Sequence, residues 1–218
     1  RINNVTLRDV DIVVNYPDGE DGAVVKCNGV NNLTIDRLTI AQTGEETGNT
    51  NPSLILGSSV RKARIESCKL PNGLTNITTT AIADLSLVNC EIGDGRVWPV
   101  IALETIKAYK LLVDRCTIRF SATGISTADS ATEWVDANSD GWTITNNTFE
   151  GNSTSRVKVM DVNEATHFLR TGLITYHNNV RRNVGAYTGL AFTCVSNDTV
   201  TATAHCLETG DLVYVSSS

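Results

Sequence analysis

A short pattern of apolar and polar positions recurs along the chain. It is clearest in DLSLVNCEI at 84–92 and KLLVDRCTI at 110–118. After the first residue, each segment reads apolar, variable, apolar, two variable positions, Cys, polar, apolar. Alternation with a period of two is typical of a β-strand, and the two-residue interruption indicates a bend that keeps the apolar side inward. The pattern therefore predicts a bent strand with one buried face.

Seven copies of this pattern can be aligned, and the distance between them varies within a narrow range. The steps run from 22 residues (Ala63 to Leu85) to 31 residues (Leu111 to Trp142). The seventh copy, GLITYHNNV at 172–180, is the least regular, because Thr175 takes an apolar position. The first apolar positions of the copies are Val5, Leu33, Ala63, Leu85, Leu111, Trp142 and Leu173. Repeats of this length that tolerate insertions at one place are typical of a solenoid.

A second apolar segment separates most copies from the next. These segments are AVVKC at 23–27, SLILG at 53–57, TAIA at 80–83, PVIAL at 99–103 and RVKVM at 156–160. In these units apolar residues do not recur with the 3.6-residue period of a helix, which excludes helical repeats. The L-x-x-L-x-L spacing is also absent, which excludes leucine-rich repeats. We predict an all-β fold, a parallel β-helix of about seven coils over residues 1–189. Loops are expected to leave the coils at 16–22, 42–52, 93–98 and 121–140.

The third apolar position of the pattern carries a column of distinctive residues. It reads Val10, Leu38, Cys68, Cys90, Cys116, Asn147 and Asn178 down the predicted stack. We interpret the three cysteines as buried free thiols that pack as small hydrophobes. Neighbouring parallel strands, about 4.8 Å apart, would also bring two thiols close enough for a disulfide. The two asparagines predict a ladder in which each amide bonds to the next, because buried amides need partners.

The pattern changes after residue 190. AFTCVSNDTVTATAHCLETGDLVYV alternates with a period of two around turn residues at Asn197-Asp198 and Thr209-Gly210. This predicts three short antiparallel strands, the start of a small β-unit over 190–218.

Charge and hydropathy exclude some classes of partner. The formal net charge of −6 argues against binding to nucleic acid or to an anionic membrane surface. No apolar run approaches the length of a membrane span, so membrane insertion is not expected. The sequence begins at Arg1 with no signal-peptide pattern. We interpret it as a segment of a longer protein, so that its ends do not indicate a location.

The repeats and the C-terminal stretch each resemble a known group of proteins. The coils from Val5 to about Gly189 look like the right-handed parallel β-helices of the pectin-lyase-like superfamily, which includes viral tailspikes and polysaccharide-degrading enzymes. TVTATAHCLETGDLVYV at 199–215 resembles a unit of viral tail and fibre proteins, T-x-T-A-x-x-H-G-L-x-x-G-D-x-V-x-V. Cys206 stands where that unit has Gly, and Cys does not favour the positive φ that Gly permits at such a turn.

Together, the two resemblances imply a segment of a viral (phage) tail fibre or tailspike. Such a protein is expected to be an extracellular part of the virion and to form a homotrimer. It is expected to contact other virion tail proteins and to bind host surface polysaccharide without a cofactor. Two alternatives remain on the same fold. One is a polysaccharide depolymerase, either a lyase or a glycoside hydrolase, and the other is a purely structural virion fibre or decoration protein.

The predicted 121–140 loop holds the candidate chemistry. Cleavage of a glycosidic bond needs two carboxylates about 5 to 9.5 Å apart, and the loop supplies four acids. Trp134 in this loop, and Trp98 in the loop before it, can stack on a sugar ring. A solvated acidic loop with one anchoring aromatic residue accounts for the same composition. We therefore favour a protein without enzymatic activity over an enzyme. The candidate acids are Asp129, Glu133, Asp136 and Asp140.

Other sites find little support in the sequence. The pectate-lyase and polygalacturonase motifs N-T-D, G-H-G and R-x-P-x-x-R are absent. Asp18, Glu20 and Asp21 could bind Ca²⁺, but a Pro-Asp-Gly turn explains them without a metal, and we expect no metal site. His177 is expected on an outer strand face.

Overall fold

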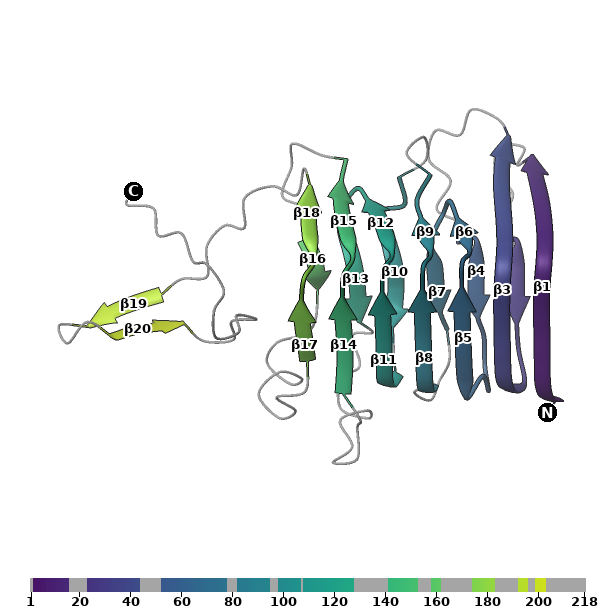
Figure 1. Ribbon diagram of the computed structural model, residues 1–218, viewed down its shortest axis with the longest axis horizontal. Helices are drawn as coiled ribbons and strands as arrows, with labels where there is room; N and C mark the ends of the chain where they lie inside the picture. Colours follow the sequence, from purple (N-terminus) through teal and green to yellow (C-terminus); the bar gives the residue numbers. More distant parts are fainter. Residues whose placement is uncertain are drawn as a thin grey trace.

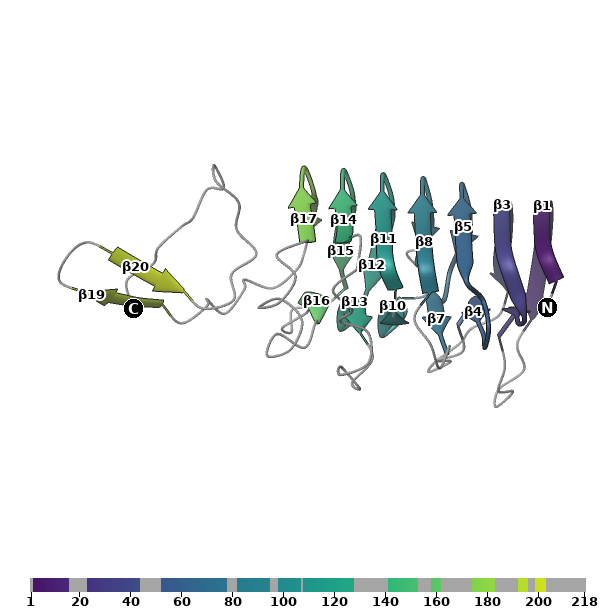
Figure 2. The ribbon, with the colours of Figure 1, turned by 90° about the horizontal axis from the view of Figure 1, so that it is seen from below.

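The computed structural model shows two parallel sheets that face each other along one long axis (Figures 1 and 2). It describes residues 2–15, 23–43, 52–77, 82–94, 98–106, 108–127, 141–152, 158–161, 174–182, 192–195 and 199–202. These residues form no helix, and so none that could cross a membrane. The predicted fold class, an all-β parallel solenoid, is confirmed.

The first sheet has 12 strands and contains every copy of the repeat pattern. Its strands are β1 (Ile2–Asn15), β3 (Val30–Thr43), β5 (Lys62–Glu66), β6 (Lys69–Leu70), β8 (Ile82–Val88), β9 (Glu91–Ile92), β11 (Ala108–Asp114), β12 (Thr117–Phe120), β14 (Gly141–Thr145), β15 (Thr148–Gly151), β17 (Ile174–His177) and β18 (Val180–Arg182). Equivalent apolar positions pair directly between coils, as Leu85 does with Leu111. Each apolar position of the pattern thus becomes a column of stacked side chains.

The second sheet has six strands, one from each of six successive passes of the chain. They are β2 (Val25–Cys27), β4 (Leu54–Leu56), β7 (Leu74–Asn76), β10 (Ile101–Ile106), β13 (Thr123–Thr127) and β16 (Lys158–Asp161). Figure 2 shows this sheet as a layer beneath the first. The inward side chains of both sheets form one apolar core, in which Leu54, Leu87 and Phe149 are fully buried.

The coil count differs from the expected seven. A unit of three short strands, two in the first sheet and one in the second, occurs four times among the described residues: β5-β6-β7, β8-β9-β10, β11-β12-β13 and β14-β15-β16. At the N-terminal end, β1 and β3 pair along their whole length and run through the bend as single strands. No second-sheet strand is described after β18.

The sequence pattern misplaces two strands of the second sheet. The TAIA segment at 80–83 is expected there, but Ile82 and Ala83 begin β8 and belong to the first sheet. The second-sheet strand of that coil is β7, whose sequence LTN has a single aliphatic residue. The predicted 121–140 loop also begins too early, because Thr123–Thr127 forms β13.

The bend in each coil is made by one residue with a positive φ. These residues are Asp9, Arg37, Ser67, Asn89, Arg115, Asn146 and Asn178, with φ between 53° and 59°. The alignment of the seventh copy is therefore wrong by one residue. Ile174, not Leu173, pairs with Trp142, and Asn179, not Asn178, follows the bend. Two adjacent asparagines make both alignments compatible with the sequence.

The predicted asparagine ladder is present with this corrected member. The Asn147 side-chain amide donates to Asn179 Oδ1 (3.0 Å) and to the Val113 carbonyl (2.9 Å). Asn147 Oδ1 accepts from the backbone N–H of Cys116 (2.8 Å). Asn147 is only 1% exposed, and these bonds satisfy the polar atoms of its side chain.

The cysteine column consists of free thiols, as expected from the sequence. Cys68, Cys90 and Cys116 are buried, and each sulfur lies within hydrogen-bond distance of two backbone carbonyls, one of its own coil and one of the preceding coil, to which its single S–H can donate. The contact of Cys90 with the Cys116 sulfur, together with burial, raises the pKa of the Cys90 thiol to about 12. Its thiolate is therefore a minor species at neutral pH.

Burial should protect this column from alkylation. Treated with iodoacetamide at pH 8 under native conditions, Cys68, Cys90 and Cys116 should react at least about tenfold more slowly than the half-buried Cys27, because reaction requires local opening of the coils. Peptide mapping by mass spectrometry measures each rate, with a urea-unfolded sample as the control. Equal labelling of all four thiols, or a disulfide-linked peptide pair, would contradict this packing.

Candidate functional site

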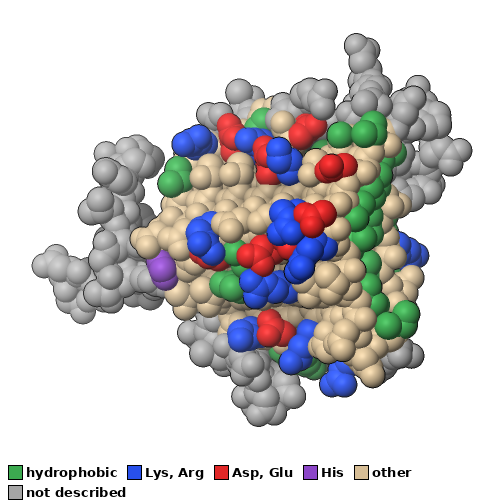
Figure 3. All heavy atoms as spheres, turned by 45° about the vertical axis from the view of Figure 1, so that its right-hand side comes forward, with side chains coloured by type: hydrophobic (Ala, Val, Ile, Leu, Met, Phe, Trp, Pro, Cys, Tyr) green, Lys and Arg blue, Asp and Glu red, His purple; other side chains and the backbone are tan. Residues whose placement is uncertain are grey.

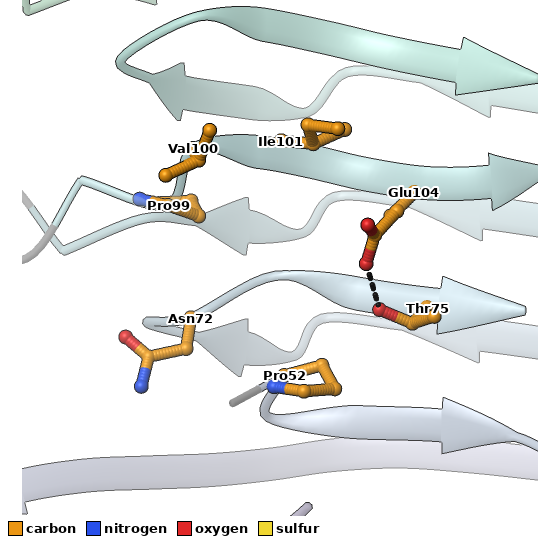
Figure 4. Close-up of a pocket in the computed structure, with 7 residues that line it drawn as sticks. All are labelled: Pro52, Asn72, Thr75, Pro99, Val100, Ile101 and Glu104. Atoms are coloured by element: carbon orange, nitrogen blue, oxygen red, sulfur yellow. Dashed lines mark hydrogen bonds between the residues drawn. The ribbon is translucent and has the colours of Figure 1, made fainter. Parts of the chain in front are cut away.

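A pocket of about 180 Å³ lies on the second sheet, at the place where the chain enters that sheet in three successive coils. Figure 4 shows residues of these coils arranged around one space, with Pro99 and Val100 on one side and Asn72 and Pro52 on the other. The pocket is lined by Pro52, Asn72, Thr75, Pro99, Val100, Ile101 and Glu104. It combines an apolar wall with three polar side chains.

The chain builds the wall with residues that restrict the backbone just before each strand. Pro52, Asn72 and Pro99 each stand two residues ahead of a second-sheet strand, β4, β7 and β10 respectively. Proline fixes φ, which makes it suitable for the turn that precedes a strand. Because the three strands are paired neighbours, residues about 20 to 30 positions apart in sequence meet at one surface.

Gly73 allows the coils to approach closely at the pocket. It closes a turn in which its N–H donates to the Leu70 carbonyl (3.2 Å), and its φ is +80°. A Cβ at this position would lie 2.4 Å from the carbonyl oxygen of Ala102 in the next coil. Only glycine combines this φ with this contact at no steric cost.

Thr75 and Glu104 form a cross-strand pair on the outward side of the sheet. They are direct partners in the β7–β10 register, and their neighbours Leu74 and Leu103 point into the core. The Thr75 hydroxyl donates to Glu104 Oε2 (2.9 Å), which fixes the carboxylate over the pocket. No donor among the described residues bonds to the second carboxylate oxygen, so this oxygen remains able to accept a hydrogen bond.

Asn72 is held firmly but has an unsatisfied acceptor. Its backbone N–H donates to the hydroxyl of Ser53 (2.9 Å), which is buried. Asn72 is 7% exposed, and its Oδ1 is buried with no hydrogen-bond donor in the described part of the chain. A buried acceptor left unpaired costs about 1–3 kcal/mol, and such groups are uncommon enough to need an explanation. Ligand binding does not supply one, because this oxygen has no accessible surface through which a ligand in the pocket could reach it.

These groups suit binding better than cleavage. The pocket offers an acceptor, the Glu104 carboxylate, beside aliphatic and proline surfaces. Its described lining includes a single carboxylate, whereas glycosidic hydrolysis needs two, and it includes no lysine, arginine or histidine. Among the described residues, no group of three or more His, Cys, Asp and Glu side chains is placed to hold a metal ion.

Most of the site residues expected from the sequence are not tested by the structure. Asp129, Glu133, Trp134, Asp136 and Asp140 lie outside the described residues, as do Asp18, Glu20 and Asp21. Trp98 is half-buried and adjoins the lining residue Pro99, but does not itself line the pocket. His177 is exposed at the end of β17, as expected.

Asn72, Thr75 and Glu104 are not among the residues predicted from the sequence. One signal could have pointed to them: three of the four prolines, Pro52, Pro71 and Pro99, stand shortly before the second-sheet strands of consecutive coils. A recurrent proline at one place in a solenoid marks a shared turn, and residues beside a shared turn become neighbours.

Several charged side chains elsewhere are paired between coils. Arg119 contacts Glu91 (2.7 Å) and Glu150 (3.1 Å), and so joins three neighbouring coils. On β1 and β3 the charge order is reversed, so that Arg8 meets Asp36 and Asp9 meets Arg37. Figure 3 shows charges of both signs intermixed on one face. These pairs are contacts between coils and do not by themselves indicate a site.

No protein-family model, curated protein or solved structure matches the chain.

Proposed function

We propose that the chain is a structural, glycan-binding segment of a viral tail fibre or tailspike. In this role it acts as a homotrimer in the virion, beside other tail proteins, and meets polysaccharide on the host surface. The observation that carries the binding role is the second-sheet pocket, in which the Glu104 carboxylate stands beside aliphatic and proline surfaces. The resemblance of 199–215 to units of viral fibres supports the virion assignment.

The solenoid suits this role physically. Within each of its two sheets, the strands of successive coils pair in parallel along the stack. This pairing gives a stiff platform whose turns hold fixed positions. Sugar hydroxyls are hydrogen-bond donors and acceptors, and sugar rings have apolar C–H faces. The pocket offers the Glu104 carboxylate for the first and aliphatic or proline surfaces for the second.

Glycan binding and assembly can be tested together. Purified protein applied to an array of bacterial surface polysaccharides should bind a subset of them, without releasing new reducing or unsaturated sugar ends. Light scattering should give three times the chain mass of 23.5 kDa. A monomer with no affinity for any glycan would contradict the proposal. Release of sugar ends would instead favour a depolymerase.

A further inference from the structure

We propose that the open edge of β1 is a docking surface for a partner protein, which adds to it a parallel strand with the same repeat pattern and an Asp-Arg pair at its bend. This inference goes beyond the proposed function and does not depend on glycan binding. Three features of β1 carry it: half-buried apolar side chains, a long backbone edge, and polar side chains that are paired on one side only.

The inward side chains of β1 are incompletely covered. On β3, the four inward apolar residues are at most 4% exposed, because β1 lies on one side of them and β5 and β6 lie on the other. The residues that pair with them on β1 are only half-buried, and they are Val5, Leu7, Val10 and Ile12. A stripe of hydrophobic side chains runs along the right-hand edge of Figure 3, on the side where β1 lies in Figure 1. One more strand would bury this apolar surface, which favours association.

The backbone edge of β1 is also open. Among the described strands β1 pairs with β3 alone, so the N–H and C=O groups on its other side have no strand partner there. Natural edge strands are often short or carry lysine or proline, which prevents unwanted pairing. β1 is 14 residues long and has neither lysine nor proline. Such an edge suits strand addition, in which main-chain hydrogen bonds give affinity and side chains give specificity.

Two charged side chains at the bend of β1 are paired on one side only. Arg8 contacts Asp36 (3.0 Å) and Arg37 contacts Asp9 (3.0 Å), so the order of the charges alternates between the two strands. Arg119 shows the effect of a second neighbour: with an acid on each side, its side chain is 21% exposed, against 57% for Arg8. An acid opposite Arg8 and a base opposite Asp9 would complete the bend of β1 in the same way.

The asparagines of β1 define a further property of the partner strand. The Asn31 amide donates to Asn3 Oδ1 (2.8 Å), and the Asn32 amide donates to Asn4 Oδ1 (2.9 Å). The amide nitrogens of Asn3 and Asn4 donate to no acceptor in the described part of the chain. Asparagines at the equivalent positions of a parallel strand would accept these bonds and extend both ladders.

A second copy of the chain suits this edge less well. Head-to-tail stacking would place the inward Ile12 against Arg181, which stands in the same column at the other end of the described first sheet. Antiparallel pairing of two β1 strands, in the register that keeps their apolar positions opposed, would place Asn4 opposite Val13. Valine offers no side-chain acceptor. A parallel repeat strand from a partner satisfies the apolar, charged and amide positions together.

The experiment uses a synthetic peptide as the probe. Its sequence is that of β3, residues 30–43, which has the apolar pattern, both asparagines and the Asp-Arg pair. The fluorescent peptide is titrated with the 218-residue chain and followed by anisotropy. A matched peptide carries Asp36→Arg and Arg37→Asp, which keeps the composition and reverses only the order of the charges. Hydrogen exchange of the complex locates the bound peptide, with β18 at the other end of the first sheet as the control strand.

We expect the peptide to bind saturably and to slow the exchange of β1 amides but not of β18 amides. The charge-reversed peptide should bind at least about tenfold more weakly, because both contacts at the bend become repulsive.

Two protein variants test the contact at the bend. Asp9→Asn should weaken binding of the first peptide by about threefold, because it removes one exposed ion pair. Asparagine tolerates the positive φ of position 9, so the backbone is preserved. Asp11→Asn is the control and should leave the affinity unchanged, since Asp11 pairs with Thr39 in β3 and would meet an uncharged threonine in the peptide as well.

Four results would contradict the inference. They are no binding of the peptide, equal affinity of the two peptides, slowed exchange at β18 instead of β1, and self-association of the chain that covers β1 and excludes the peptide. The last result would assign the edge to a second copy. None of them affects the test of glycan binding, so the proposed function stands or fails separately.

Discussion

Replacement of Gly73 by alanine should lower the free energy of unfolding by about 3 kcal/mol or more. Two causes combine at this position. An alanine must adopt a φ of +80°, and its Cβ would lie 2.4 Å from the Ala102 carbonyl oxygen. A left-handed non-glycine residue costs about 1–2 kcal/mol, and the backbone contact can be relieved only by separating two paired coils. Urea unfolding followed by far-UV circular dichroism measures the change.

Gly29→Ala is the matched control for this substitution. Gly29 has a similar φ of +68°, but no atom of the described residues lies within 4 Å of the place that a Cβ would take. It should therefore show the conformational cost alone, about 1–2 kcal/mol. Gly73→Ala should also weaken glycan binding, because Gly73 positions Asn72, whereas Gly29→Ala should leave binding unchanged. Equal losses of stability in the two variants would contradict the close contact between the coils at Gly73.

Replacement of Asn147 by leucine should destabilise the protein by about 2–5 kcal/mol. The Cys116 N–H and the Val113 carbonyl lose their Asn147 side-chain partner, and Asn179 Oδ1 loses one of its donors. Because the side chain is 1% exposed, water does not replace these bonds, and each unpaired group costs about 1–3 kcal/mol. The size of leucine is not the difficulty, since Leu38 fills the equivalent position in an earlier coil.

Asn147→Cys tests the cause of that loss. In the coil before, the Cys116 sulfur accepts from the Cys90 backbone N–H (3.4 Å), so a cysteine at 147 can accept from Cys116 in the same way. Asn147→Cys should therefore lose less stability than Asn147→Leu in the same urea titration. A leucine variant as stable as wild type would contradict the structural role of the ladder.

The first sheet can be predicted from the sequence because apolar and polar residues alternate along its strands. Leu85 and Leu87 face inward on one coil, Leu111 and Val113 do so on another, and their pairing is the one that the pattern predicts. The second sheet is harder to predict from the sequence, because its strands are short. In β7 the sequence LTN places a threonine outward and a buried asparagine inward, which gives no apolar alternation to detect.

The registration of the last copy depends on backbone conformation. Either Asn178 or Asn179 could occupy the bend by composition, since asparagine tolerates a positive φ. The choice is made by pairing, in which Ile174 lies beside Trp142 and the Asn179 side chain bonds to Asn147. Such a one-residue difference changes which side chains face the core, and it places Tyr176 against Phe149.

The pocket was beyond prediction for a different reason. Asn72, Thr75 and Glu104 carry no recognisable motif, and their proximity follows from the register of β7 with β10. Composition instead favours the long acidic segment, because an excess of acids is visible there without any knowledge of the fold. A site made by single residues of several coils becomes apparent only when the stacking of those coils is known.

A crystal structure of the protein with its tightest-binding oligosaccharide tests the central claim most directly. One sugar ring should occupy the second-sheet pocket, with a hydroxyl group donating to the Glu104 carboxylate at about 2.6–3.0 Å. A sugar bound at another surface, with this pocket unoccupied, would contradict the assignment of the pocket as the glycan site.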